Sequence, residues 1–182
     1  MSNFRANDPL LLAGKIITLI AQGACVLGGL VLAALIPVML FMQDTISAEV
    51  AAKYGEAAGA FPGLAFAGVF LIGLTILALA FMFFGKLRRI IGTVGEGDPF
   101  APANAKRLNN MAWLMLGVQI LMIPAGALGF YLAQWADEIE TANINIDGGV
   151  DGTGILMVIV LFILARVFRH GTAMREDLEG TV

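Results

Sequence analysis

Four long runs of apolar residues divide the chain, and each is long enough to cross a lipid bilayer as a helix. They cover about residues 16–42, 61–85, 111–135 and 152–169, and a spanning helix needs roughly 20 mostly apolar residues. The first three runs contain no Asp, Glu, Lys, Arg or His. An ionisable side chain at the bilayer centre costs about 2.5–3.5 kcal/mol, so these runs are suited to lipid. The pattern predicts an all-α integral membrane four-helix bundle, forming one membrane domain over residues 1–182.

The fourth run is short, but it spans the bilayer if Arg166 and Arg169 extend their charged ends to the interface. Apolar side chains recur beyond it at three- and four-residue intervals, including Val167, Phe168 and Met174. Such spacing places them on one face of a helix. We therefore expect the fourth helix to continue out of the membrane into the tail, residues 170–182.

Basic residues are distributed unequally between the two sides of the predicted membrane segment. One side, which includes the loop of residues 86–110, carries ten of the eleven: Arg5, Lys15, Lys86, Arg88, Arg89, Lys106, Arg107, Arg166, Arg169 and Arg175. Only Lys53 falls on the other side, among many carboxylates. Loops rich in Lys and Arg stay in the cytoplasm. The distribution predicts that both termini lie on the cytoplasmic side.

The composition agrees with a membrane location and gives little support to other classes. Hydrophobic residues make up 59% of the chain and charged residues 14%, whereas soluble domains average about 45–50% and 25%. The formal net charge of −3 does not indicate direct binding of nucleic acid. Cys25 is the only cysteine, so no internal disulfide can form.

Two further patterns are glutamines inside the spans and a regular spacing of apolar and aromatic residues in an outer segment. Gln22 and Gln119 lie well inside the first and third spans, where each either bonds to a neighbouring helix or lines a transport path. In the outer segment 43–60, Ile46, Val50 and Tyr54 recur every four residues, which predicts a short surface helix.

No catalytic, cofactor or metal site is evident. Asn143, Asn145 and Asp147 imitate the start of a calcium loop, but its twelfth position is Gly154 where a bidentate Glu would be needed. His170 is the sole histidine and has no second histidine or cysteine with which to bind a metal. We therefore expect neither an enzyme nor a cofactor.

The inner loop and the tail carry the most specific pattern. The stretch from Gly97 to Pro99 predicts a sharp turn, and Pro102 suits the first turn of a helix that continues into the third span. Phe100 is an apolar side chain in a polar loop and needs a surface to pack on. The apolar stripe of the tail either packs on Phe100 and the inner loop or receives a helix or strand of a partner. Glu176 and Asp177 add an acidic patch of the kind that attracts a basic protein.

These two segments resemble the bacterial membrane proteins grouped as domain of unknown function 2975. The residues that carry the resemblance are Gly97-Asp98-Pro99-Phe100, Asn104, Arg107 and Leu108, then Leu164 to Arg169, Gly171, Arg175-Glu176-Asp177-Leu178 and Thr181-Val182. That family has no established enzymatic activity, and its members are often encoded beside small helix-turn-helix DNA-binding proteins. The resemblance therefore implies a membrane component that holds or releases a transcription factor.

The leading hypothesis is a non-enzymatic regulatory protein of a bacterial inner membrane that sequesters such a helix-turn-helix protein through its inner loop and tail. The predicted partner-binding residues are Asp98, Pro99, Phe100, Asn104, Arg107, Arg166, Phe168, Arg169, Met174, Arg175, Glu176, Asp177 and Leu178. The alternative is a small transporter or channel subunit acting as a homo-oligomer, in which Gln22, Gln119 and helix glycines line a path. In either case the predicted spans contact the lipid bilayer.

Overall fold

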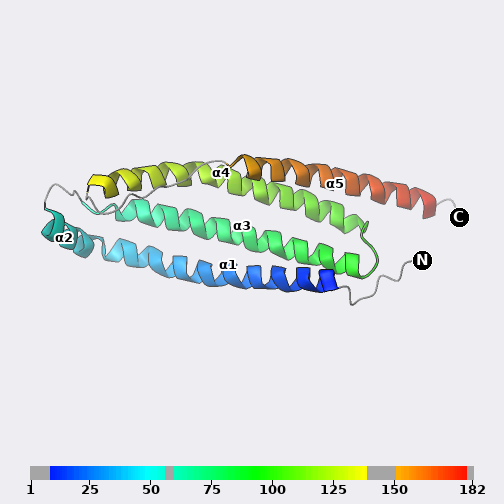
Figure 1. Ribbon diagram of the computed structural model, residues 1–182, viewed down its shortest axis with the longest axis horizontal. Coiled ribbons are helices and arrows are strands. Elements are labelled where there is room, and N and C mark those ends of the chain that lie inside the picture. The colour runs from blue at the N-terminus through cyan, green and yellow to red at the C-terminus, as the bar shows by residue number, and fades with distance from the viewer. Residues whose placement is uncertain (1–8, 56–59, 139–150, 180–182) are drawn as a thin grey trace. The chain divides into compact units, whose positions relative to one another are not determined.

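A computed structural model describes residues 9–55, 60–138 and 151–179 of the chain, and all regular structure in these ranges is helical (Figure 1). The helices are α1 (Pro9–Phe41), α2 (Gln43–Tyr54), α3 (Gly63–Gly95), α4 (Pro102–Glu138) and α5 (Gly152–Glu179). The predicted all-α class is confirmed.

Four of these helices, α1, α3, α4 and α5, are long and apolar enough to cross a membrane. Many of their large apolar side chains are exposed, such as Leu27 at 67% and Leu64 at 77%. In water such surfaces would be unfavourable, whereas lipid tails cover them without cost. The four helices identify the chain as a multi-pass membrane protein.

The helices extend beyond the apolar runs at their polar ends. Helix α3 continues to Gly95 and α4 begins at Pro102, so most of the predicted inner loop, residues 86–110, is helical. Pro102 occupies the first helical position, where its missing N–H leaves no intrahelical bond unmade. Helix α5 continues to Glu179, as the spacing of its apolar residues predicted.

The predicted short helix of the outer segment is present as α2. It ends at Tyr54 and is followed by Gly55, whose φ of 84° lies in the left-handed region that favours glycine. The Ser47 hydroxyl accepts a hydrogen bond of 3.1 Å from the backbone N–H of Phe61. This bond connects α2 to the start of α3.

The chain forms two compact units. Helices α1, α3 and α4 each contribute residues to both units. Unit 1 comprises Met1–Val26, Leu79–Val118 and Asp151–Val182, and unit 2 comprises Leu27–Ala78 and Gln119–Val150.

Unit 2 is held together by contacts of glycine with leucine and by an aromatic group. A Cβ added at Gly73 of α3 would lie 3.1 Å from the Cδ1 atom of Leu32 in α1, so the two helices approach closely there. The ring of Trp135 in α4 contacts Phe61 and Phe66 edge-on, with centroids 5.6 Å and 6.2 Å away.

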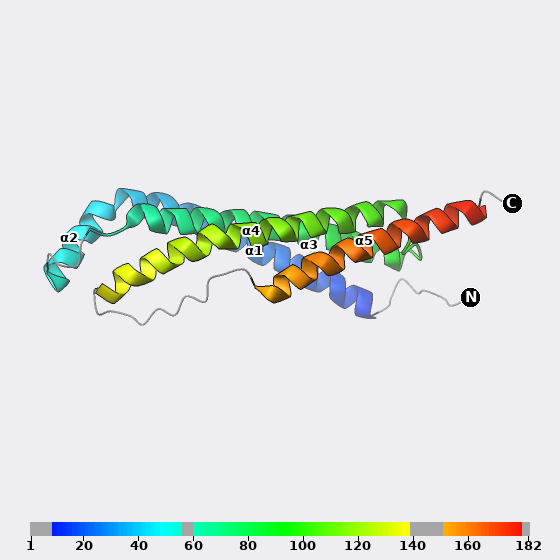
Figure 2. The same cartoon turned by 90° about the horizontal axis from the view of Figure 1, so that it is seen from above.

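Unit 1 has a buried core shared by α3, α4 and α5. Its fully or nearly fully buried side chains include Met111 and Ala112 of α4 and Ala165 of α5, and Ile90 of α3 packs with them. Helix α5 lies alongside the part of α4 that begins at Pro102, and its last turns project beyond the connection between α3 and α4 (Figures 1 and 2). The tail and this connection are therefore neighbours.

Candidate functional site

The sharp turn predicted after α3 is a Schellman motif. The backbone N–H of Gly97 donates to the carbonyl of Val94 (3.1 Å), and that of Asp98 donates to the carbonyl of Thr93 (3.0 Å). Gly97 has a φ of 84°, as the motif requires at this position. The turn reverses the chain within a few residues and presents Asp98 and Phe100 to α5.

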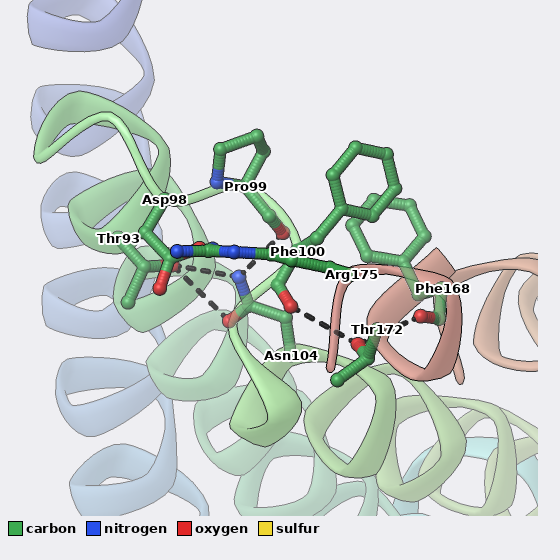
Figure 3. Close-up of polar contacts among 8 residues, drawn as sticks. All are labelled: Thr93, Asp98, Pro99, Phe100, Asn104, Phe168, Thr172 and Arg175. Carbon is green, nitrogen blue, oxygen red and sulfur yellow. Dashed lines mark hydrogen bonds and ion pairs between the residues drawn. The ribbon is translucent and has the colours of Figure 1, made fainter. Parts of the chain in front are cut away.

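The side chain of Asn104 stabilises this turn through hydrogen bonds (Figure 3). Its side chain is fully buried, and the Nδ2 group donates to the hydroxyl of Thr93 (2.8 Å) and the carbonyl of Pro99 (3.0 Å). Its Oδ1 atom accepts a bond of 2.8 Å from Arg107. A buried amide left without partners would be costly, so this complete set of bonds determines the conformation of the connection.

Arg107 also donates to the carbonyl of Arg89 at 3.4 Å, which links α4 to α3. Asn104 and Arg107 were predicted to bind a partner. Their observed contacts lie within the α3–α4 hairpin, where they support the connection that carries Asp98 and Phe100.

Thr172 attaches the tail to this connection. Its buried hydroxyl lies 3.0 Å from the carbonyl oxygen of Phe100 and 2.9 Å from that of Phe168. The single hydroxyl proton is thus shared between the connection and the helix that carries Thr172. The rings of Phe100 and Phe168 pack beside this bond, with centroids 5.4 Å apart (Figure 3).

Gly171 permits the close approach of α5 to Phe100. A Cβ at this position would lie 2.9 Å from two atoms of the Phe100 ring, a separation that carbon atoms do not tolerate. Only glycine fits here unless the ring moves.

An ion pair between Asp98 and Arg175 completes the attachment. Both side chains remain about half exposed, at 42% and 51%, so solvent weakens the attraction. We call the set of Asp98, Phe100, Phe168, Gly171, Thr172 and Arg175 the tail clasp. Phe168 and Gly171 of the apolar stripe thus pack on Phe100, whereas Val167 and Met174 of the same stripe remain exposed.

The remaining predicted residues of α5 lie outside the clasp. Arg166, Arg169, Met174 and Asp177 have exposed side chains. The side chains of Glu176 and Leu178 lie outside the described residues, as does the calcium-like stretch 143–147. Thr93 and Thr172 were not among the predicted site residues, because a helical threonine carries no local sign of a distant partner.

Two open grooves flank α5 near the clasp. The lateral groove, between α4 and α5, is lined by Asn109, Phe162, Ile163, Arg166, Arg169 and His170, and it continues past Ala173 to Lys106. The tip groove is lined by Phe100, Arg166, Val167, His170, Gly171 and Met174. Both lie within unit 1, and the predicted residues Arg166, Arg169 and Met174 line one or both of them.

Elsewhere, the Nε2 group of Gln22 in α1 donates to the carbonyl of Phe81 in α3 at 3.3 Å, which confirms the predicted bond between helices. Gln119 is buried. Within the part of the chain that the structure describes, no group of three or more His, Cys, Asp or Glu side chains could hold a metal ion.

Comparison with known proteins gives one match. The family described as "Protein of unknown function (DUF2975)" matches residues 48–182, a range that includes both segments on which the resemblance was based. No curated protein and no solved structure matches the chain.

Proposed function

The chain belongs to the DUF2975 family, and from this premise we propose that it is a non-enzymatic regulatory protein of a bacterial inner membrane. It binds a small cytoplasmic helix-turn-helix DNA-binding protein at the α3–α4 connection and the end of α5. While bound, that protein is withdrawn from its promoters.

The basic residues near the clasp support a cytoplasmic location for it. Arg88, Arg89 and Lys106 are exposed on α3 and α4, and Arg166 and Arg169 are exposed on α5. All five lie in unit 1, at the polar ends of their helices. Positive charge near span ends favours the cytoplasmic side, where a DNA-binding partner would be found.

The tip groove is the observation that carries the proposal. Phe100 and Met174 remain 41% and 55% exposed, although the α5 extension projects beyond the predicted membrane span. Arg166 and His170 line the same groove. A groove lined by both apolar and basic side chains suits an amphipathic helix of a partner, and a helix-turn-helix protein consists of such helices.

The clasp offers a means of regulation, because Phe100 belongs to both the clasp and the tip groove. A signal that displaces α5 from the connection would move Phe100 and change the groove. A ligand or partner shifts such an equilibrium only by its difference in affinity for the two states. A change from almost fully bound to almost fully free needs about 5.5 kcal/mol, and partial release needs less.

Co-purification of the full-length protein from detergent-solubilised membranes of its native host tests the proposal. Met174→Gln should lower retention of the partner about tenfold, because an apolar side chain buried at an interface contributes about 1.5–3 kcal/mol. Ala173→Gln is the matched control, since Ala173 is the neighbouring exposed residue and lines the lateral groove instead.

Equal retention by both variants would contradict the assignment of the tip groove. If no helix-turn-helix protein is recovered with the wild-type chain, the sequestration hypothesis is wrong. A reporter fused to the carboxyl end that is active only outside the cytoplasm would contradict the orientation.

A further inference from the structure

The lateral groove has two chemically different halves. Phe162, Ile163 and Ala165 of α5 make one half apolar, and Arg166, Arg169 and His170 make the other half basic. Asn109 of α4 faces the basic half, and Lys106 lies where the groove continues towards Pro102. The part lined by Asn109, Phe162 and Arg166 has a volume of about 840 Å³, within the range of small-molecule sites, about 300–1,000 Å³.

The boundary between these halves coincides with the expected edge of the membrane. The uncharged apolar run of α5 ends at Ala165, one residue before Arg166, and that of α4 begins at Met111, two residues after Asn109. The two helices are antiparallel here, since Phe100, just before α4, contacts Phe168, whereas Trp113, further along α4, contacts the earlier residue Phe162 (ring centroids 5.4 Å and 5.5 Å apart). The apolar half therefore faces acyl chains, and the basic half lies at the depth of the headgroups.

We propose that the lateral groove binds an anionic phospholipid. The phosphate group lies between Arg166, Arg169 and Lys106, the amide of Asn109 and the ring of His170 donate further hydrogen bonds, and an acyl chain follows Phe162 and Ile163. Basic pockets between transmembrane helices at the cytoplasmic interface are typical sites for acidic headgroups. None of the described residues lining the groove is acidic, so the field there attracts an anion.

A lipid fits this groove better than a water-soluble partner does. The side chains of Phe162 and Ile163 belong to a candidate span, where the bilayer covers them and a cytoplasmic protein cannot reach. A free phosphate ion would use only the basic half. The inference requires only that the chain lies in a membrane, and it stands independently of the proposed capture of a DNA-binding protein.

Native mass spectrometry of the delipidated full-length protein in detergent tests the inference. We expect retention of phosphatidylglycerol at concentrations where phosphatidylcholine is lost. Arg166→Gln and Arg169→Gln should each weaken phosphatidylglycerol binding about fivefold, because a basic residue near an anionic lipid surface contributes about 1 kcal/mol. Arg88→Gln removes the same charge from an exposed position outside the groove and should leave binding unchanged.

A second variant tests the shape of the groove without changing its charge. Ala173 is exposed and lines the groove both where Arg166 and His170 line it and where it continues to Lys106, so Ala173→Phe fills the space for the headgroup. Its phosphatidylglycerol binding should fall at least tenfold, while the helix content by circular dichroism stays unchanged.

Three results would overturn the inference. One is equal retention of phosphatidylglycerol and phosphatidylcholine. Another is a loss with Arg88→Gln as large as that with Arg166→Gln. The third is displacement of the lipid by millimolar inorganic phosphate, because it would show a site for a free anion without acyl-chain recognition.

Discussion

The helix contacts of unit 2 and the tail clasp of unit 1 both hold segments of the chain together, but through different interactions. In unit 2, Gly73 lets Leu32 approach closely, and Gly68 does the same for Leu128. In the clasp, Thr172 donates to a backbone carbonyl and Arg175 pairs with Asp98. Lipid tails are as apolar as leucine, so helices in the bilayer associate through close packing at small residues. At the polar end, water competes for every group, and directional bonds determine which surfaces meet.

The two kinds of contact also differ in how specific the residue types at their positions must be. Glycine and leucine are common in all the spans, so many pairs of positions could form the contacts of unit 2. The clasp requires a glycine at position 171 and a threonine at position 172, and the turn that carries it requires an asparagine at position 104. We therefore expect substitutions in the clasp region to have larger and more residue-specific effects than substitutions in unit 2.

The largest effect is expected from Asn104→Ala. It removes a fully buried amide and leaves the Pro99 carbonyl and the Thr93 hydroxyl without that partner. An unsatisfied buried polar group costs about 1–3 kcal/mol, so the free energy of unfolding, measured by SDS titration in mixed micelles, should fall by that amount. Asn110→Ala, at a half-buried position on the same helix, is the control. If both variants lose equal stability, the network does not have this role.

An intermediate effect is expected from Gly171→Ala. Overpacking costs about 1–3 kcal/mol, and the gain in helix propensity offsets about 1 kcal/mol of it, which leaves a loss of about 1 kcal/mol. Gly73→Ala should be nearly neutral, because the Leu32 methyl group that it meets at 3.1 Å is the end of a flexible side chain. Gly92→Ala, with no atom within 4 Å of the new Cβ, should stabilise the protein. Thermal unfolding in detergent gives this ranking.

The cause of the Gly171→Ala effect can be checked by removing the ring that it meets. In a Phe100→Ala background the new methyl group has free space, so the added cost of Gly171→Ala should vanish. A cost that persists in this background would assign the effect to some contact other than the Phe100 ring.

The smallest effect in the clasp is expected from Asp98→Asn. A half-exposed ion pair contributes about 0.2–1 kcal/mol, and salt screens it, since the Debye length is about 10 Å at 0.1 M ionic strength. A double-mutant cycle with Arg175→Gln should give a coupling energy in this range that declines as salt is added. A coupling that salt leaves unchanged would mean that the pair is less accessible to solvent than its exposure indicates.

Much of the fold and part of the site could be predicted from the sequence. The four spans, the helix in the outer segment, the turn at Gly97 and the start of α4 at Pro102 all follow from local patterns. These patterns act through groups close together in the chain, such as a glycine that permits a positive φ. The need of Phe100 for a packing surface was also evident, because an apolar ring in a polar segment is rarely left in water.

The hydrogen bond of Thr172 shows what local patterns leave undecided. Thr75 in α3 donates to the carbonyl four residues earlier, that of Leu71, at 2.9 Å. Thr172 makes the same local contact with Phe168, and only the fold adds the carbonyl of Phe100, separated from it by 72 positions. The two threonines make the same local bond and differ in their tertiary surroundings.

The amino-acid sequence by itself determined that this chain forms helices that enter a membrane, because transfer of apolar side chains and charges between water and lipid depends on composition along each segment. Its basic residues also supplied the prediction of orientation. Only the tertiary structure decided which of the predicted partner-binding residues face inward. Asn104 and Arg107 support the hairpin, whereas Arg166, Arg169 and Met174 line grooves. The physical reason is that burial and hydrogen bonding depend on which distant surfaces come within a few ångströms of each other.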